Sequence, residues 1–340
     1  MAPHFKRRLS GVTSTVIQLV PEQARLGRGI VTLGPGLPDS LPKMRWRQFP
    51  ALWRRPATAR FRVWHARRNT EMLPGILMKY ILRMPLKLLF TSAAQRNHSG
   101  YTKWLIRKMD AVVATSARSG SFLEVPHTVI RHGIDLDVFR PPRSGEDTID
   151  AAGIPGNHLI GCFGRVRHQK GTDLFVRAMI ELLPHHPDWT AVVCGRVTAE
   201  HQAFGDELRA MVADAGLSDR IRFLGEVDDI KPWYRRLTLY VAPSRNEGFG
   251  LTPLEAMASR TAVVASDAGA YAEQIVSGQT GAVVPAGAYE ALRDAIAPYL
   301  ADPTLAKRHG QAGLEHVRNG FALEREATAL EPVYDRLLKS

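Results

Sequence analysis

The sequence predicts an α/β protein built from two doubly wound, Rossmann-like domains. The chain has 340 residues, whereas a single hydrophobic core stops growing near roughly 250–300 residues, so two domains are expected. Short apolar runs alternate with helical patterns in both halves of the chain. The runs are continuous rather than alternating, which indicates parallel strands covered by helices on both faces.

The second half shows this alternation most clearly. Residues 158–165, HLIGCFGR, are an apolar run ending in Gly-Arg and predict a strand, and residues 172–187 have helical spacing that stops at prolines. The further strands are predicted at 189–196, 221–227, 237–244, 261–266 and 280–285. The further helices are predicted at 204–217, 230–237, 253–259, 269–278 and 289–300.

The first half is a less regular unit of the same kind. Its helices are predicted at 14–23, 73–84 and 101–109, and its strands at 29–36, within 60–69, and at 86–92, 110–116 and 127–135. Residues 139–150, FRPPRSGEDTID, are rich in Pro, Gly and charge, as linkers are. The predicted domains are therefore 1–140 and 141–320, followed by a helical segment, 321–340, that could pack back on the first domain.

Charge is distributed unevenly along the chain. Its net charge is +12, but residues 1–145 carry 25 Lys and Arg against 7 Asp and Glu, whereas the remainder carries 20 against 26. The first half therefore predicts an anionic partner: nucleic acid, an acidic membrane surface or an anionic substrate.

Several sequence features indicate a cytoplasmic protein. The basic N-terminal stretch lacks the apolar run of a signal peptide, and no window reaches the roughly 18 apolar residues of a membrane span. Cys162 and Cys194 both lie in apolar runs, which favours buried thiols in a reducing compartment.

Two loops that follow predicted strands carry candidate chemistry, because ligands of doubly wound sheets bind at the carboxyl ends of the strands. In 164–171, GRVRHQKG, Arg165 and Lys170 lie before a helix, where two cations suit a diphosphate; a solvated basic turn is equally compatible. In 243–259, PSRNEGFGLTPLEAMAS, Glu247 and Glu255 have seven residues between them.

The two glutamates of that second loop allow different interpretations. Thr252, Pro253 and Glu255 fit the N-cap, N1 and N3 positions of a capping box, which would explain Glu255 without any ligand. The NEGFG stretch has two glycines that permit close approach of a ligand, and its N–H groups would face an anion. Glu247 would then lie beside a hydroxyl-rich sugar.

The stretch from residue 243 to 285 resembles the retaining glycosyltransferases of family 4, which have the GT-B fold. Their signature is a pair of glutamates with the spacing of Glu247 and Glu255. GRVRHQKG resembles their diphosphate loop, and GIDLDVFRP, 133–141, resembles their interdomain turn, with His132 where Asn is usual. The resemblance is strongest over residues 130–290. Short segments of the first half, such as RVWHARRN at 62–69, are similar to segments of the mannosyltransferases of bacterial lipopolysaccharide core assembly.

The resemblance implies a role for each matched position. Arg165 and Lys170 would bind the donor diphosphate and stabilise the departing nucleotide, Glu247 would hold sugar hydroxyls, and Glu255 would reach the ribose in addition to capping its helix. Glu247, Arg165 and Lys170 are the expected catalytic residues. The other expected donor contacts are Gly11, in a loop before the first helix, and Gly164, Gly195, Gly225, Gly248, Phe249, Gly250, Leu251 and Thr252.

The sequence departs from the family pattern in ways that lead to further expectations. The chain leaves no room for an opening strand before its first glycine loop, so either the start is truncated or the sheet lacks its usual first strand. Relatives often have a His after the strand that ends at Ser92; here His98 and His65 are the candidates, with a structural role at least as favoured as a catalytic one. Arg260 replaces the usual Gly after a helix, so a local change of that turn is expected.

The resemblance implies a metal-independent retaining glycosyltransferase. The resemblance implies a hexosyl transfer, with mannose from GDP-mannose as the first choice of donor, onto an anionic glycolipid of the lipopolysaccharide core, without a cofactor and without nucleic acid. Basic stretches interleaved with apolar or aromatic residues suggest peripheral binding to the inner membrane; they are 6–8, 45–47, 53–55, 65–68 and 77–87. The alternatives are a UDP-sugar donor for another surface polysaccharide, a nucleotide-sugar epimerase, and a non-catalytic protein that binds anionic surfaces or nucleic acid.

Overall fold

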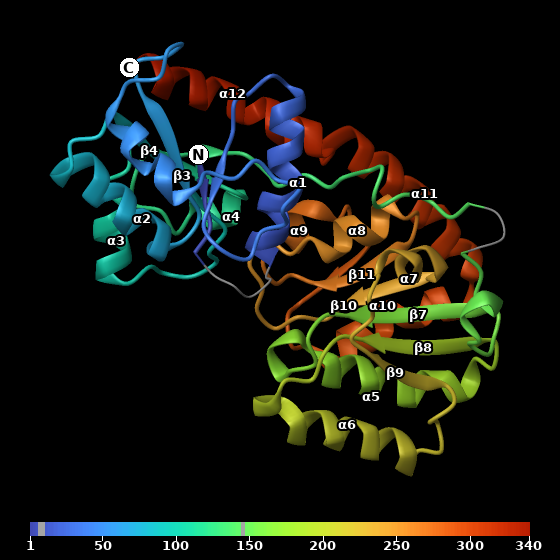
Figure 1. The fold of residues 1–340 in the computed structure, drawn as a ribbon. Coiled ribbons are helices and arrows are strands. Elements are labelled where there is room, and N and C mark those ends of the chain that lie inside the picture. Colours follow the sequence, from blue (N-terminus) through green and yellow to red (C-terminus); the bar gives the residue numbers. More distant parts are fainter. Residues whose placement is uncertain (6–10, 144–146) are drawn as a thin grey trace. The chain divides into compact units, whose positions relative to one another are not determined.

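The computed structural model describes residues 1–5, 11–143 and 147–340 and divides the chain into two compact units (Figure 1). Unit 1 consists of Met1–Gly133 and Phe321–Ser340, and unit 2 consists of Ile134–Gly320. The division falls at Gly133 rather than at the expected position 140, and the C-terminal segment belongs to unit 1.

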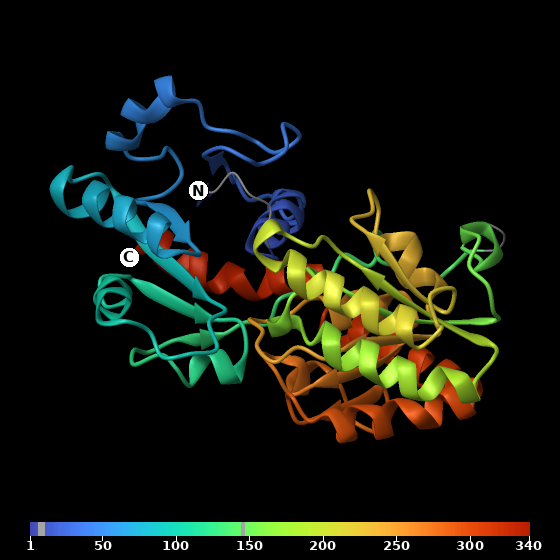
Figure 2. The same cartoon turned by 90° about the horizontal axis from the view of Figure 1, so that it is seen from below.

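Unit 2 is built on a parallel sheet in the order β12-β11-β10-β7-β8-β9. Its strands are β7 (His158–Phe163), β8 (Trp189–Cys194), β9 (Ile221–Gly225), β10 (Leu239–Ala242), β11 (Ala262–Ser266) and β12 (Gly281–Val284). Neighbouring side chains such as Leu159 and Ile160 are both fully buried, because helices cover both faces of the sheet (Figures 1 and 2). The strand order reverses between β7 and β10, which makes the edge between their carboxyl ends the switch point where such sheets bind ligands.

The helices of unit 2 follow the predicted alternation, with one addition. They are α5 (Thr172–Leu182), α6 (Gln202–Asp214), α7 (Lys231–Arg236), α8 (Thr252–Ala258), α9 (Tyr271–Gln274), α10 (Tyr289–Ala301) and α11 (Pro303–Gly320), with short η3 (Asp150–Ala152), η4 (His168–Lys170), η5 (Leu183–His185) and η6 (Ala199–His201). No helix is predicted for the span of α11. Its buried residues lie at helical spacing, and two of those that face α8 and β11 are glycines, Gly310 and Gly313.

The turn after α8 corrects the expectation for Arg260. The residue keeps the left-handed conformation, with φ of 64°, instead of changing the turn. Its N–H donates to the carbonyl of Met257 at 3.0 Å, and the N–H of Thr261 donates to the carbonyl of Ala256 at 3.0 Å, the two bonds of a Schellman motif. A Cβ on Gly310 would lie 2.4 Å from the carbonyl oxygen of Arg260, so close packing of α11 also constrains this turn.

Replacing Arg260 by glycine is expected to stabilise unit 2 by roughly 0.5–1 kcal/mol, because glycine adopts a positive φ without strain. The gain is smaller than the full strain energy because glycine also increases the entropy of the unfolded chain. Calorimetry would show a higher melting temperature for the transition of unit 2. The control Arg308→Gly, on the exposed face of α11, should lower stability by about 1 kcal/mol. A loss of stability in both variants would contradict the strain at Arg260.

Unit 1 has a second parallel sheet, β3-β4-β5-β6, and a two-stranded pair, β1-β2. The strands are β1 (Ala2–Pro3), β2 (Thr32–Leu33), β3 (Arg62–Ala66), β4 (Leu86–Ser92), β5 (Ala111–Ala114) and β6 (Thr128–Val129). The Met1 amino group donates to the carbonyl of Val63 at 2.7 Å, and the N–H of His65 donates to the carbonyl of Met1 at 3.0 Å, so β1 lies beside β3. A strand of two residues therefore precedes the first glycine loop, where the sequence was expected to leave no room for one.

The helices of unit 1 surround these strands. They are α1 (Gly11–Arg25), α2 (Asn69–Ile76), α3 (Gly100–Ile106), α4 (Ala117–Gly120) and α12 (Leu323–Lys339), with short η1 (Trp46–Trp53) and η2 (Leu77–Ile81). Residues of α12 at helical spacing, including Leu323, Leu330 and Leu337, share a core with Leu19 of α1 and Leu89 of β4. Among the described residues, no helix has both the length and the apolar character needed to cross a bilayer.

Candidate functional site

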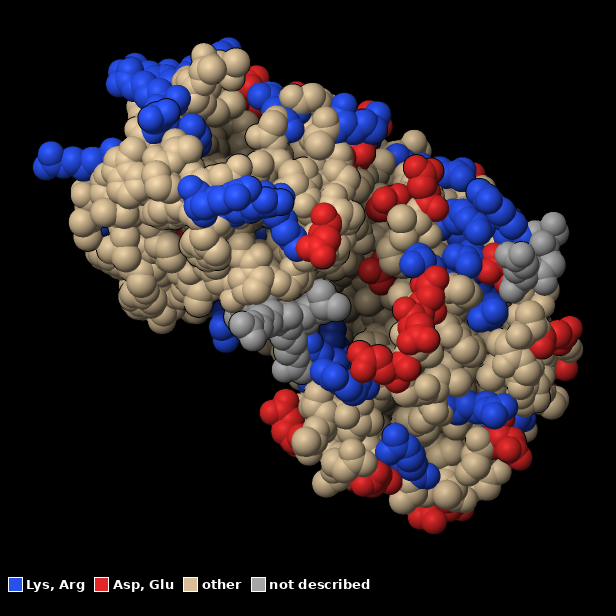
Figure 3. All heavy atoms as spheres, viewed as in Figure 1, with Lys and Arg blue, Asp and Glu red and all other residues tan. Residues whose placement is uncertain are grey.

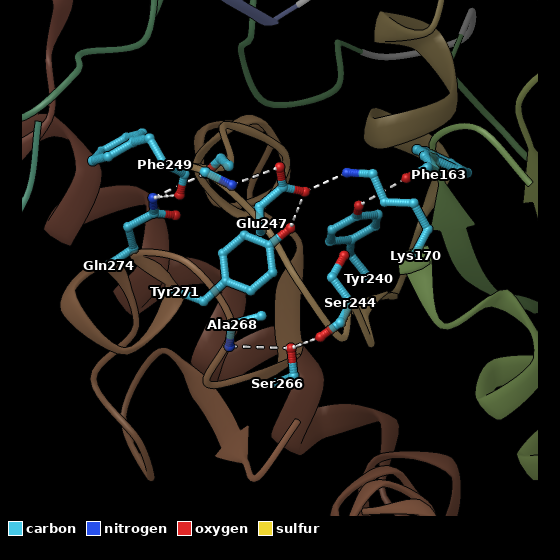
Figure 4. Close-up of polar contacts among 12 residues, drawn as sticks. Phe163, Lys170, Tyr240, Ser244, Glu247, Phe249, Ser266, Ala268, Tyr271 and Gln274 are labelled. Carbon is cyan, nitrogen blue, oxygen red and sulfur yellow. Dashed lines mark hydrogen bonds and ion pairs between the residues drawn. The ribbon is translucent and has the colours of Figure 1, made fainter. Parts of the chain in front are cut away.

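The loops after β7 and β10 meet at the switch point of unit 2. Lys170 ends η4, which follows β7, and Glu247 lies in the loop between β10 and α8. Figure 4 shows their side chains pointing toward one another, with Tyr271 of α9 beneath. The structure thus brings together two residues that are 77 positions apart and that the sequence analysis assigned to one donor site.

Glu247 is held by three groups. Lys170 Nζ and Glu247 Oε2 form an ion pair, the Tyr271 hydroxyl donates to the same oxygen at 3.3 Å, and the N–H of Gly248 donates to Oε1 at 3.0 Å. Burial raises the pKa of this carboxyl, but the charge of Lys170 and these hydrogen bonds outweigh it, so the pKa lies below its usual value. Glu247 is therefore a carboxylate at neutral pH, an acceptor suited to hydroxyl groups.

The glycine-rich loop has a fixed shape. Gln274 Nε2 donates to the carbonyls of Phe249 and Gly250 at 3.0 and 2.9 Å. Gly250 has φ of +74°, and a Cβ there would lie 2.3 Å from the ring of Tyr271, so only glycine fits. The amide of Gly248 was expected to face an anion; in the structure Glu247 accepts its hydrogen bond.

A second connection between the two loops was not predicted from the sequence. Nη1 and Nη2 of Arg245 donate to the two carboxylate oxygens of Asp173 in α5 at 2.7 Å each, and Nη1 also donates to the carbonyl of His168 at 2.7 Å. The N–H of Arg245 donates to the carbonyl of Gln169 at 2.9 Å. Arg245 therefore attaches the Glu247 loop to the Lys170 loop, but nothing in its local sequence indicates a partner 72 positions away.

Replacing Arg245 by glutamine is expected to destabilise unit 2 by about 1–3 kcal/mol, because it removes a bidentate, partly buried ion pair. It should also raise the KM for the donor, since the two loops lose their connection. The matched control is Arg209→Gln, which removes the exposed pair with Asp206 and should change stability by less than about 0.5 kcal/mol. Equal effects in a melting experiment would show that the Arg245 pair has no special role.

Three expected donor contacts lie together at the ends of β7, β8 and β9. The N–H of Gly164 donates to the carbonyl of Cys194 at 2.8 Å, and the N–H of Gly195 donates to the carbonyl of Gly225 at 2.7 Å. A Cβ on Gly195 would lie 1.8 Å from the carbonyl oxygen of Gly164, so these loops pack backbone against backbone. Arg165, half-buried, directly follows this contact.

Glu255 does not cap its helix, which corrects the capping-box interpretation. The N-cap of α8 is Leu251, without a side-chain cap, and Thr252 hydrogen-bonds instead with Tyr240 and Tyr271. Tyr234 donates its hydroxyl to Glu255 Oε2 at 2.7 Å. Burial raises the pKa of Glu255 to about 7, although the bond from Tyr234 and the charge of Lys170 act in the opposite direction.

The candidate residues of unit 1 have different environments. Gly11 is the exposed first residue of α1 rather than part of a preceding loop, and residues 6–10 lie outside the described part. His65 is buried, and its ring nitrogens contact Tyr334 at 2.8 Å and Thr91 at 2.6 Å; burial holds its pKa well below the usual value, which favours a structural role. His98 is half-buried, and its Nε2 has no hydrogen-bond partner among the described residues.

The cysteines are buried, as predicted, and neither forms a disulfide. Burial raises the pKa of Cys162 to about 12 and that of Cys194 to about 11, so both are protonated thiols of the core. Within the described residues, no three His, Cys, Asp or Glu side chains gather as metal ligands.

Comparisons with known proteins identify the family to which the chain is similar. Residues 146–316 match the family described as glycosyl transferases group 1. The chain is 74% identical, over 99% of its length and 96% of the relative, to the lipopolysaccharide core biosynthesis mannosyltransferase LpcC of Rhizobium leguminosarum bv. viciae. It is 54% identical, over 100% of its length and 97% of the relative, to the enzyme named LpsB of Rhizobium meliloti. The solved structure of Anabaena Alr3699/HepE with UDP and glucose matches with a TM-score of 0.83 at 17% identity, covering 99% of each chain, a likeness of fold alone.

Proposed function

The chain belongs to the group 1 glycosyltransferases and has the GT-B fold, and from this membership we propose that it transfers mannose from GDP-mannose to an anionic glycolipid of the lipopolysaccharide core. The observation that carries the proposal is the sequence identity of 74% and 54%, over nearly the full length of the chain, with two relatives named as mannosyltransferases of that core. The ion pair between Lys170 and Glu247 at the switch point of unit 2 supports it, because it places a cation and a sugar-binding carboxylate side by side.

In this proposal the two loops bind different parts of the donor. Arg165 and Lys170 contact the diphosphate, Glu247 accepts hydroxyls of the sugar, and Glu255 accepts those of the ribose. The backbones of Gly164, Gly195 and Gly225 lie along the nucleobase, and those of Gly248–Thr252 along the sugar and phosphate. Gly11 is also assigned to the diphosphate. Phosphate oxygens compete with Glu247 for Lys170, so binding the diphosphate frees Glu247 for the sugar.

The proposed reaction retains the configuration of the anomeric carbon. The bond between that carbon and the β-phosphate oxygen breaks, and its electron pair stays on the diphosphate, where Lys170 and Arg165 stabilise the charge. The acceptor hydroxyl attacks the same face, and its proton passes to the departing phosphate oxygen. No enzyme nucleophile is required, so Glu247 and Glu255 are not a hydrolase-type acid and base.

Purified protein incubated with labelled GDP-mannose, UDP-glucose or UDP-galactose and a lipopolysaccharide core precursor tests the donor. We expect labelled glycolipid and free GDP from GDP-mannose only, and nuclear magnetic resonance should identify an anomeric configuration equal to that of the donor. Transfer from a UDP-sugar alone would show that the donor is a UDP-sugar and not GDP-mannose. Inversion of the configuration at the anomeric carbon would exclude the proposed front-face reaction.

Unit 1 is proposed to bind the acceptor and the cytoplasmic face of the inner membrane. Except for Val138, the exposed large apolar side chains of the described residues belong to unit 1; among them are Trp46, Ile81 and Trp104, at 68%, 68% and 45% exposure. On the face in Figure 3, Lys and Arg predominate over Asp and Glu on unit 1, whereas unit 2 carries both signs. Aromatic and cationic side chains together suit an anionic bilayer surface.

Flotation with vesicles tests this surface. The protein should float with vesicles containing phosphatidylglycerol and not with pure phosphatidylcholine, and raising the salt should weaken the association. The double variant Trp46→Ser and Ile81→Ser should reduce flotation, whereas Val138→Ser on unit 2 should not. Salt-independent flotation would count against the electrostatic part of the proposal.

A further inference from the structure

Tyr271, the first residue of α9, packs against the glycine-rich loop but is not among the expected donor contacts. Its side chain is 1% exposed, and a Cβ on Gly250 would lie 2.3 Å from its ring. The turn before it is equally close, since a Cβ on Gly269 would lie 2.9 Å from the Cβ of Glu247. Figure 4 shows the Tyr271 hydroxyl pointing toward the Glu247 carboxylate. The start of α9 is therefore packed directly against the residue proposed to bind the sugar.

The hydrogen of the Tyr271 hydroxyl goes to Glu247. The pKa of Glu247 lies below its usual value, so its carboxylate only accepts hydrogen bonds, and Tyr271 must be the donor. The side chains of Ser244 and Thr252 also hydrogen-bond with this hydroxyl, and both can donate to its oxygen. Burial raises the pKa of Tyr271 well above its usual value, so the donor keeps its hydrogen throughout the neutral range.

Glu247 has free acceptor positions on both oxygens only when Lys170 is bound elsewhere. A carboxylate has about four lone-pair positions, two on each oxygen. The N–H of Gly248 uses one position of Oε1, whereas Tyr271 and Lys170 use both positions of Oε2. In the proposed donor complex Lys170 contacts the diphosphate, which leaves one free position on each oxygen. Two neighbouring acceptors of this kind match two hydroxyls on adjacent carbons of a hexose.

Tyr271 and Gly248 are then the two groups that hold the carboxylate. Gly248 belongs to the same loop as Glu247, whereas Tyr271 comes from a separate element, α9, and holds the other oxygen. Without the bond from Tyr271, the carboxylate can turn about the bond that carries it, because the terminal torsion of a glutamate has broad energy minima. Such a rotation would move both free acceptor positions away from the sugar hydroxyls.

We propose that Tyr271 is a positioning residue for the donor sugar: its hydroxyl fixes the Glu247 carboxylate so that each oxygen accepts from one of two neighbouring sugar hydroxyls. With a side chain that is almost fully buried, Tyr271 acts on the sugar through Glu247 and not by direct contact. This role rests on the proposed function, because it requires a nucleotide-sugar whose diphosphate binds Lys170 and whose sugar binds Glu247.

Calorimetric titration of the full chain with GDP-mannose and with GDP tests this role. Tyr271→Phe removes the hydroxyl and keeps the ring that packs on Gly250. The variant should bind GDP within about twofold of the wild type, because GDP has no sugar. It should bind GDP-mannose about tenfold more weakly, the usual effect of losing one hydrogen bond to a charged group. The value of kcat/KM for GDP-mannose should fall by at least about the same factor.

A double-mutant cycle separates positioning from a general structural effect. Glu247→Ala removes the carboxylate, so adding Tyr271→Phe to it should change the affinity for GDP-mannose by less than about twofold. The matched control is Tyr299→Phe, which removes another buried hydroxyl of unit 2, bonded to His309 at 2.9 Å. This control should lower the melting temperature but leave the affinities for GDP and GDP-mannose within about twofold.

Three results would overturn the role of Tyr271 while leaving the transferase assignment intact. They are an unchanged affinity for GDP-mannose in Tyr271→Phe, an equal loss of affinity for GDP and GDP-mannose, and a loss that persists in the Glu247→Ala background. If the wild type binds neither GDP nor GDP-mannose, the donor assignment fails, and the role of Tyr271 fails with it.

Discussion

Replacing Lys170 by alanine is expected to lower the rate of glycosyl transfer by about 10²–10³-fold, the usual effect of losing one group that stabilises developing charge. The diphosphate leaves with two negative charges, and Lys170 is one of two cations assigned to it. Steady-state kinetics with GDP-mannose should place most of the loss in kcat rather than in KM, because the charge develops in the transition state.

The same substitution has a structural effect that has to be separated from catalysis. Without Lys170, Glu247 is a sheltered carboxylate with only Tyr271 and Gly248 as partners, which should cost roughly 1–3 kcal/mol of stability. Adding Glu247→Gln to Lys170→Ala should restore the melting temperature but not the activity. Lys231→Ala, which removes an exposed lysine of unit 2, serves as control and should retain both. Wild-type activity in Lys170→Ala would exclude the diphosphate role.

Much of the fold could be predicted because parallel strands and amphipathic helices leave strong periodic patterns. The strand at 86–92 agrees with β4 to the residue, and the alternation from 158 to 300 reappears as the sheet of unit 2. Two helices of unit 2 were missed or overextended: α11, whose buried face includes two glycines, was not predicted, and α9 has only four residues where ten were predicted. In both cases tertiary contacts, not local propensity, decide the structure.

The candidate site, too, depends on tertiary contacts that the local sequence does not indicate. The local sequence around Thr252 and Glu255 predicted a helix cap, but both side chains form hydrogen bonds with tyrosines of β10, α7 and α9 instead. The pair Arg245–Asp173 also joins residues distant in sequence, so no local spacing reveals it. Lys170 and Glu247 were found because their residue types resemble a family pattern, not because the spacing implies a contact.

Replacing Glu255 by glutamine is expected to stabilise the protein at alkaline pH, contrary to what a capping role would give. Burial raises the pKa of this carboxyl from 4.5 to about 7, so the folded state holds a proton that the unfolded state releases. Stability from this group is therefore present below pH 4.5 and lost as the pH rises to about 7. Glutamine removes that loss, and at pH 8.5 the gain should be roughly 2–3 kcal/mol.

Melting curves at pH 4.5 and pH 8.5 test the sign of this effect. The free energies of unfolding of the Glu255→Gln variant and the wild type should differ little at pH 4.5 and clearly at pH 8.5. The control Glu207→Gln, on the exposed face of α6, should change the free energy of unfolding by no more than about 0.5 kcal/mol at either pH. Destabilisation at both pH values would instead show that the hydrogen bond between Tyr234 and Glu255 outweighs the cost of the buried charge. Affinity for GDP should fall by about tenfold in Glu255→Gln, because a neutral amide is a weaker acceptor for ribose hydroxyls. Together these results would show that the Glu255 carboxylate lowers the stability of the folded protein but is needed to bind the donor. A raised pKa at this position would then indicate a role in function rather than in folding.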